Sequence, residues 1–183
     1  MIQLLIRQGA NANAGNRRGS TPMHVAAMHW SNEHVIKVLK DLGVSINRAD
    51  RMGTTALHEA ARSSGARMVN QLISSGANPF GTDNTGATPL HVAAWYGNLE
   101  AASALLCRTR NSGIDISDNQ ARTALFYACW QGHTTLCSLL VERGANVRCQ
   151  DTTGATILHA ALINQSRGCF VEVFRDPTVP AKS

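Results

Sequence analysis

The order of apolar and polar residues between positions 86 and 106 predicts two short helices joined by a tight turn. Thr88 suits a helix N-cap, because its hydroxyl accepts a hydrogen bond from the first turn, and Pro89 follows where no backbone N–H is needed. Apolar residues over 90–94 form a narrow stripe that ends at a glycine, and the alanine- and leucine-rich run 99–106 predicts a second helix. Two such helices cannot bury their apolar faces alone, so we expect similar neighbours.

The same signal recurs along the chain. The motif begins with a threonine and places an aromatic or imidazole ring three residues later, at steps of 34, 33, 35 and 33 residues. The pattern runs from threonine-alanine or threonine-proline through leucine and histidine to paired alanines and a glycine, and it closes with Gly-Ala-Asn. This pattern resembles the ankyrin repeat. The five motifs begin at Thr21, Thr55, Thr88, Thr123 and Thr156.

The resemblance covers nearly the whole chain and implies an all-α solenoid of helix-turn-helix pairs linked by β-hairpin-like loops. It implies one array over residues 1–183, divided into a half repeat 1–16, repeats 19–50, 53–83, 86–118 and 121–151, a degraded terminal repeat 154–176 and a tail 177–183. Both end repeats expose apolar positions where a terminal repeat needs a polar outer face. We therefore expect a monomeric fragment of a longer chain.

The hairpin turns show two departures from the repeat. Ala121 stands where the other repeats have glycine, and we expect Asn119 to take the left-handed conformation in that turn instead. The loop over residues 109–113 is two residues longer than its counterparts and is expected to bulge outward. Aspartates recur at one hairpin position, where we expect each to accept the amides of its own turn: Asp50, Asp83, Asp118 and Asp151.

Composition narrows the class of protein. Of the 183 residues, 44% are hydrophobic, enough for a core, and no apolar run approaches the roughly 20 residues of a membrane span. The N-terminus lacks the basic and apolar regions of a secretory signal, and the five cysteines form no C-x-x-C pair. Cys129 and Cys137 fall on helix positions, so we interpret them as buried thiols in a reducing compartment rather than disulfides or a zinc site. The expected location is cytoplasmic, with a nuclear location as the alternative.

Four histidines resemble ligands, but each lies in a different repeat, at one shared repeat position: His24, His58, His91 and His159. Packed-helix distances put neighbouring ones about 10 Å apart, too far to share a metal. The resemblance implies that each ring bonds its own motif threonine and a nearby backbone carbonyl, whereas Phe126 in the fourth repeat loses that bond. His58-Glu59 lacks the second histidine of a zinc-protease helix, because position 62 is Arg62. No nucleotide-loop or nucleophile motif occurs, so we expect no catalysis, cofactor or metal.

The aromatic and arginine residues indicate a surface that binds a partner. The net charge of +5 comes from 14 arginines against 3 lysines, and arginine is favoured at protein contacts and phosphates. By position, the resemblance places helix ends and hairpin tips on a concave face, where Trp, Tyr and Arg typically dominate binding. The alternative is that these rings merely pack against the next repeat. The predicted partner-binding residues are Arg17, Arg18, Met28, His29, Trp30, Arg51, Met52, Arg62, Trp95, Tyr96, Arg122, Trp130 and Gln131.

These features favour a non-enzymatic protein–protein interaction scaffold or adaptor whose partner carries an acidic segment near the arginine-rich first half. The alternatives are nucleic-acid or phosphorylated-ligand binding on the same basic aromatic groove, or the substrate-recruiting part of a larger multidomain protein. Two smaller signals stay open. Asn13 and Asn47 stand where the family offers asparagine to a hydroxylase, and Asn78-Pro79-Phe80 matches a tripeptide bound by EH domains.

Overall fold

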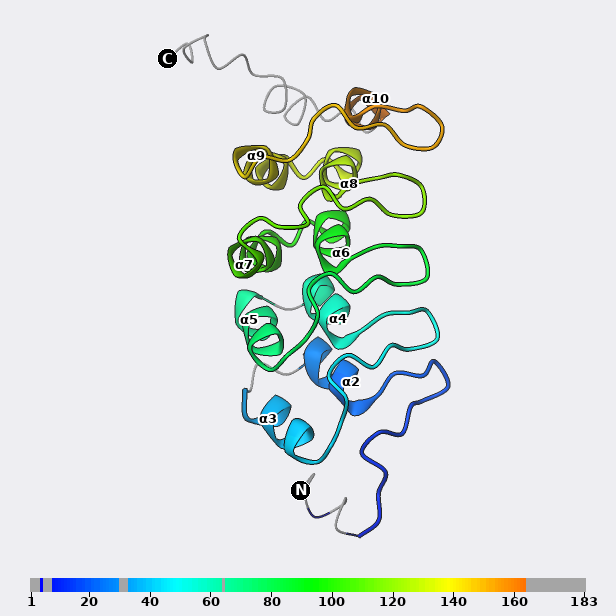
Figure 1. The fold of residues 1–183 in the computed structure, drawn as a ribbon, viewed down its shortest axis with the longest axis vertical. Coiled ribbons are helices and arrows are strands. Elements are labelled where there is room, and N and C mark those ends of the chain that lie inside the picture. Colours follow the sequence, from blue (N-terminus) through cyan, green and yellow to red (C-terminus); the bar gives the residue numbers. More distant parts are fainter. Residues whose placement is uncertain (1–3, 5–7, 30–32, 64, 164–183) are drawn as a thin grey trace.

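The computed structural model describes residues 4, 8–29, 33–63 and 65–163, and it shows helix pairs stacked along one axis. The first helix of each pair lies in one row, the second helices lie in a parallel row, and loops project beside the first row (Figure 1). The first helices are α2 (Pro22–His29), α4 (Ala56–Ser63), α6 (Pro89–Tyr96), α8 (Ala124–Gln131) and α10 (Ile157–Ile163). The second helices are α3 (Glu33–Asp41), α5 (Ala66–Ser74), α7 (Leu99–Thr109) and α9 (Thr134–Glu142).

Each helix packs on the corresponding helix of the next repeat. Contacts run from α2 through α4, α6 and α8 to α10, and separately from α3 through α5 and α7 to α9. Within a pair, the two helices also contact each other, as α6 and α7 do. This nearest-neighbour pattern confirms the expected all-α solenoid. None of the described helices is long and apolar enough to cross a membrane.

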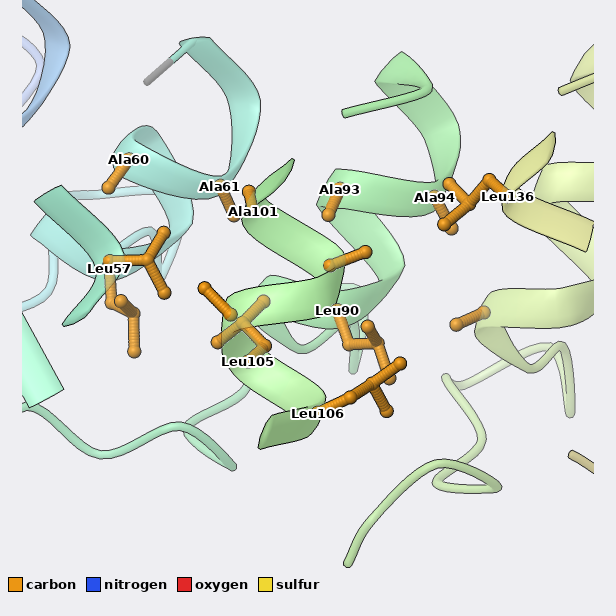
Figure 2. Close-up of a cluster of buried hydrophobic side chains, with 14 of the residues drawn as sticks. Leu57, Ala60, Ala61, Leu90, Ala93, Ala94, Ala101, Leu105, Leu106 and Leu136 are labelled. Atoms are coloured by element: carbon orange, nitrogen blue, oxygen red, sulfur yellow. The ribbon is translucent and has the colours of Figure 1, made fainter. Parts of the chain in front are cut away.

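The core lies between the two rows of helices and continues from repeat to repeat. Figure 2 shows Leu57, Leu90, Leu105 and Leu106 filling the space between helices that approach each other over paired alanines. All four leucines are at most 7% exposed, and Ala93 is fully buried. Alanine at these positions lets neighbouring first helices pack closely, because its side chain adds only a methyl group.

The third repeat shows why each helix begins and ends where it does. Thr88 caps α6 in a capping box with His91, and Pro89 occupies the first turn. Gly97 ends the helix in a left-handed conformation with φ of 68°. The Asn98 side chain then accepts a hydrogen bond from the Ala101 amide at 3.1 Å, which starts α7 one residue after the turn.

The hairpins are joined to one another by backbone hydrogen bonds. The Asn84 amide donates to the Met52 carbonyl at 2.9 Å, and the Asn119 amide donates to the Thr85 carbonyl at the same distance. At Gly86, φ is +81°, and a Cβ there would lie 2.7 Å from the Asn119 amide nitrogen. Glycine is therefore required at Gly86 both by the turn and by the next hairpin's approach.

The expectation for the fourth hairpin was wrong in one respect. Ala121 itself adopts the left-handed conformation with φ of 59°, and Asn119 does not. The turn keeps the geometry of its glycine-containing counterparts, because the Ala121 amide still donates to the Asp118 carbonyl at 3.0 Å. The hydrogen bonds of the hairpin therefore impose a conformation that alanine alone disfavours.

The long loop after α7 is built from two left-handed residues, Arg110 and Asn111. Arg110 and Ser112 are exposed, whereas Ile114 is 8% exposed and anchors the loop in the core. Gly113 lies so close to Phe80 that a Cβ there would come within 2.6 Å of its ring. The loop therefore covers part of the Phe80 side chain, which is 40% exposed.

Candidate functional site

The repeated histidines have the structural role that the resemblance implied. In the third repeat, His91 Nδ1 accepts from the Thr88 amide at 3.1 Å and bonds the Thr88 hydroxyl at 2.8 Å. Because Nδ1 accepts from an N–H, the proton is on Nε2, which donates to the Arg122 carbonyl of the next repeat at 3.0 Å. Equivalent cross-repeat bonds run from His24 to the Thr54 carbonyl and from His58 to the Ala87 carbonyl.

Burial keeps the rings of His58 and His91 neutral. Desolvation lowers the pKa of His58 and of His91, outweighing the hydrogen bonds and nearby carboxylates that raise it. Both rings are nearly inaccessible. Within the described part of the chain, no group of three or more His, Cys, Asp or Glu side chains is arranged to hold a metal ion.

The hairpin aspartates also form the expected turns. Asp83 Oδ1 accepts from the Thr85 amide at 2.8 Å, the Thr85 hydroxyl at 2.6 Å and the Ala87 amide at 3.0 Å. Asp50, Asp118 and Asp151 each accept amides of their own turn in the same way. These carboxylates fix the hairpins and place one negative charge in each loop.

The exposed sides of the first helices, together with the hairpin loops, form one side of the molecule, which we call the hairpin-side face (Figure 1). Its centre carries an aromatic cluster of Trp95, Phe126, Tyr127 and Trp130. The Trp95 ring meets Tyr127 edge-on at 5.3 Å between centroids and Trp130 at 6.2 Å, whereas Tyr127 and Trp130 are parallel at 6.5 Å. Trp95 is 41% exposed, so the cluster is open to solvent at that ring.

Arg122 covers one end of the aromatic cluster. Its guanidinium carbon lies 4.5 Å from the Trp130 ring centroid and 5.5 Å from that of Phe126. The same guanidinium pairs with Asp151 Oδ2 at 3.2 Å. The Thr153 hydroxyl, other donors of the turn and Arg122 lower the pKa of Asp151 to about 2, so this carboxylate stays charged.

A hollow of about 290 Å³ opens between α4 and α6 at the other end of the cluster, and we call it the α4–α6 hollow. Glu59, Arg62, Trp95, Tyr96 and Tyr127 line it from the helices, and Asp83 lines it from a hairpin. Arg62 donates from Nε at 2.9 Å and from Nη2 at 2.7 Å to Glu59 Oε2, and its guanidinium lies 5.9 Å from the Tyr96 centroid.

The Tyr127 hydroxyl is held at the edge of the hollow by Asp118. It donates to Asp118 Oδ2 at 2.5 Å. Burial and this bond raise the pKa of Tyr127 to about 12, so the phenol stays neutral across the physiological range.

Five of the residues that the sequence singled out meet in this region: Arg62, Trp95, Tyr96, Arg122 and Trp130. Arg17, Arg18, Arg51 and Met52 are exposed on the first hairpins, apart from the hollow, and His29 is exposed at the end of α2. Met28 and Gln131 are partly buried, and Trp30 lies outside the described residues.

Sequence reasoning missed Tyr127 and Glu59. Both occupy the position immediately after the motif ring, which Val25 and Val92 fill in other repeats. Val25 is 44% exposed and Val92 is partly exposed, so this position opens onto the hairpin-side face in the first four repeats. The signal was available, because a single repeat position that holds valine, glutamate and tyrosine is not a core position.

Two further groups carry structural roles. Cys129 and Cys137 are fully buried thiols with their sulfurs 3.3 Å apart, and Cys169 lies outside the described residues. The Asn47 amide nitrogen donates to the Gly76 carbonyl at 3.0 Å, while its oxygen accepts from the Asn78 amide at 2.8 Å. Asn13 bridges to the next repeat in the same manner.

Comparison with known proteins places the whole architecture in one family. A family model of ankyrin repeats in three copies matches residues 1–83 and 110–175, and a second model of ankyrin repeats in many copies matches residues 72–128. The probable 26S proteasome regulatory subunit p28 of Saccharomyces cerevisiae is 35% identical over 156 residues, which are 84% of this chain and 68% of that protein.

Two longer relatives carry similar repeats. SH3 and multiple ankyrin repeat domains protein 2 of Homo sapiens is 33% identical over 158 residues, or 86% of this chain and 8% of that protein. Tyrosine-protein kinase Shark of Drosophila melanogaster is 44% identical over 97 residues, or 52% of this chain and 10% of that protein. The chain therefore spans about a tenth of the length of these two relatives.

Proposed function

Because this chain belongs to the ankyrin-repeat family, we propose that it is a non-enzymatic interaction module that binds a protein partner through its hairpin-side face. Repeats of this family form protein-interaction modules. In this chain the module acts as a cytoplasmic scaffold or adaptor. We also propose the division of residues 1–183 into the repeats given above.

The observation that carries this proposal is the solvent-open aromatic cluster beside the α4–α6 hollow. Trp95 and Tyr96 are 41% and 54% exposed, although both are large rings that proteins otherwise bury. Tryptophan, tyrosine and arginine are the residue types that contribute most at protein interfaces. Trp95 is wedged edge-on against two other rings, so little side-chain freedom is lost when a partner covers it.

The first hairpins are the second part of the proposed surface. Arg17, Arg18 and Arg51 are exposed there, and no described carboxylate forms an ion pair with any of them. Exposed arginines of this kind favour an acidic segment of the partner, which they would steer toward the face. We propose that such a segment lies over the first two hairpins.

Binding of nucleic acid is disfavoured by the charges of the same face. Four of the five described hairpins carry an aspartate, the first having Asn16 instead. The guanidiniums of Arg62 and Arg122 are already paired with Glu59 and Asp151. A phosphate chain would have to displace these pairs or approach the carboxylates. The charges of this face therefore favour a protein partner over a nucleic acid.

The test is a selection of peptides from a displayed library against the whole chain, followed by calorimetric titration of the peptides recovered. Trp95→Ala should weaken a selected peptide by about 30-fold, the effect of losing one interface hot spot. Lys37→Ala and Arg108→Ala are the matched controls, because these exposed side chains lie on second helices α3 and α7. If Trp95→Ala binds the selected peptides as tightly as the wild type does, or if only the control variants lose affinity, the peptides bind outside the hairpin-side face.

Titration of the chain with a single-stranded oligonucleotide at increasing salt concentration tests the alternative, nucleic-acid binding on the same face. If the oligonucleotide binds more tightly than the peptides, and its affinity falls steeply with salt, the partner is a nucleic acid and not a protein.

A further inference from the structure

We propose that the α4–α6 hollow binds a positively charged side chain, lysine or arginine, of the partner segment. This inference rests on the proposed function and deepens it by naming the chemistry that the centre of the face selects. The acidic segment expected over the first hairpins would then be followed, along the same partner, by a basic residue seated between α4 and α6.

The size of the hollow suits one side chain. Its volume of about 290 Å³ lies at the lower end of the range that holds small ligands. Trp95, Tyr96 and Tyr127 supply aromatic surface, and Glu59 and Asp83 supply carboxylates. Aromatic faces combined with carboxylates are typical of sites for ammonium and guanidinium groups, since both attract a cation and rings cover its apolar stem.

The charges that line the hollow leave it negative. Two carboxylates, Glu59 and Asp83, face one guanidinium, Arg62, so the hollow carries one net negative charge. His58 and His91 add none, because burial lowers the pKa of each ring and keeps it neutral. An anionic side chain would meet repulsion here, whereas a cation restores neutrality.

Each of the two carboxylates that line the hollow has one oxygen to which no described donor is bonded. Glu59 accepts both bonds from Arg62 on Oε2, and Asp83 accepts its three turn bonds on Oδ1. Among the described residues, no hydrogen bond is made to Glu59 Oε1 or to Asp83 Oδ2. These two oxygens can accept the N–H groups of an incoming lysine or arginine.

The face already binds two guanidinium groups of its own in the same way. Arg62 lies over Tyr96 while paired with Glu59, and Arg122 lies over Trp130 while paired with Asp151. Trp95 lies between these two, and within the described structure no cation covers it. The partner's cation would lie over Trp95 in the same way, with Asp83 as its carboxylate.

The test titrates the whole ¹⁵N-labelled chain with N-acetyl-arginine amide and N-acetyl-lysine amide, using N-acetyl-norleucine amide as the neutral probe. The Trp95 indole N–H, assigned by its loss in Trp95→Phe, reports on the hollow. We expect saturable shifts at millimolar concentrations of both cations and none with norleucine. Shifts of equal size with norleucine, or none with either cation, would overturn the inference.

Asp83→Asn is the decisive variant, because its remaining oxygen can keep the turn bonds while the negative charge is lost. We expect the affinity for both cationic probes to fall by about tenfold, as for the loss of one charged hydrogen-bond partner. Lys37→Ala, on α3, should leave it unchanged. An unchanged affinity in Asp83→Asn, with the melting temperature of the wild type, would refute the role of the carboxylate.

The same probes separate this inference from the proposed function. If selected peptides bind in a Trp95-dependent manner but tolerate norleucine in place of every lysine and arginine, the protein-binding face stands and the cation site falls. If the cationic probes shift Trp95 while selected peptides are insensitive to Trp95→Ala, the cation site stands and the proposed docking face falls.

Discussion

Replacing His91 by phenylalanine tests whether the histidine network joins one repeat to the next. The fourth repeat shows the outcome at the same position, because Phe126 is buried there and the Thr123 hydroxyl accepts from its amide at 3.3 Å. Phenylalanine therefore fits the space, and the Thr88 hydroxyl can turn to the helix amide. The substitution removes the hydrogen bonds of the imidazole and leaves a ring of similar size in the same space.

The magnitude follows from the three bonds of the ring. The Thr88 amide loses its acceptor in a buried place, which costs about 1–3 kcal/mol. The Arg122 carbonyl loses the Nε2 bond but keeps the Asp118 amide at 3.0 Å, so this loss is only about 0.5–1.5 kcal/mol. We expect the free energy of unfolding to fall by about 2–4 kcal/mol in His91→Phe.

The assay is urea unfolding followed by circular dichroism, with His159→Phe as the matched control. His159 makes the same threonine bonds but is exposed, and the described structure gives it no carbonyl partner in a further repeat. His159→Phe should lower the free energy of unfolding by less than about 1 kcal/mol, because water can form the hydrogen bonds that the ring made. If His91→Phe lowers the free energy of unfolding no more than His159→Phe does, and its dependence on urea concentration is unchanged, the histidine network does not hold the repeats together.

Three further predictions concern the turns and the pH dependence. Gly76→Val should lower the free energy of unfolding by about 1–2 kcal/mol, because φ at Gly76 is +102° and the surrounding space is open, so strain alone acts; an unchanged melting temperature would contradict this. Ala121→Gly should raise stability by about 0.5–1 kcal/mol, since relief of the left-handed strain exceeds the entropy gained by the unfolded chain; a lower urea midpoint would count against it. The pKa values of His58 and His91 are lowered on folding, so the unfolded chain binds more protons below about pH 6.5. Stability should therefore be full above about pH 6.5 and fall as the pH drops toward 5, with a smaller fall in His91→Phe, and a midpoint that rises on acidification would refute the sign.

The repeat architecture was predictable because its signals are local. Thr88-Pro89 marks the start of a helix by capping, and Gly97 marks its end, so helix bounds follow from a few adjacent residues. The histidine role followed from the family resemblance, and its geometry is confirmed in three successive repeats.

The turn at Ala121 was less predictable for a physical reason. Asparagine tolerates the left-handed conformation better than alanine, which favoured Asn119 on local grounds. The register of the hairpin decided otherwise, because the amide of Ala121 must reach the Asp118 carbonyl. Hydrogen bonds with the rest of the hairpin outweighed the preference of one residue.

The site could be predicted only in part, since its pairings cross repeats. The pair of Arg122 with Asp151 joins residues 29 apart, and the contact of Trp95 with Tyr127 joins two helices. The sequence indicated which residues were suited to recognition but not which arginines were already neutralised. Arg62 and Arg122 proved to be paired within the face, whereas the exposed arginines of the first hairpins form no ion pair with a described carboxylate.

The most direct measurement of the central claim is hydrogen–deuterium exchange of the whole chain with and without a saturating selected peptide. We predict slower exchange at the hairpin turns 16–20, 50–54, 83–87 and 118–122 and at the C-terminal ends of α4, α6 and α8, with exchange in α7 and α9 unchanged. Protection centred on the exposed sides of α7 and α9, with the hairpins exchanging as in the free chain, would contradict a partner bound on the hairpin-side face.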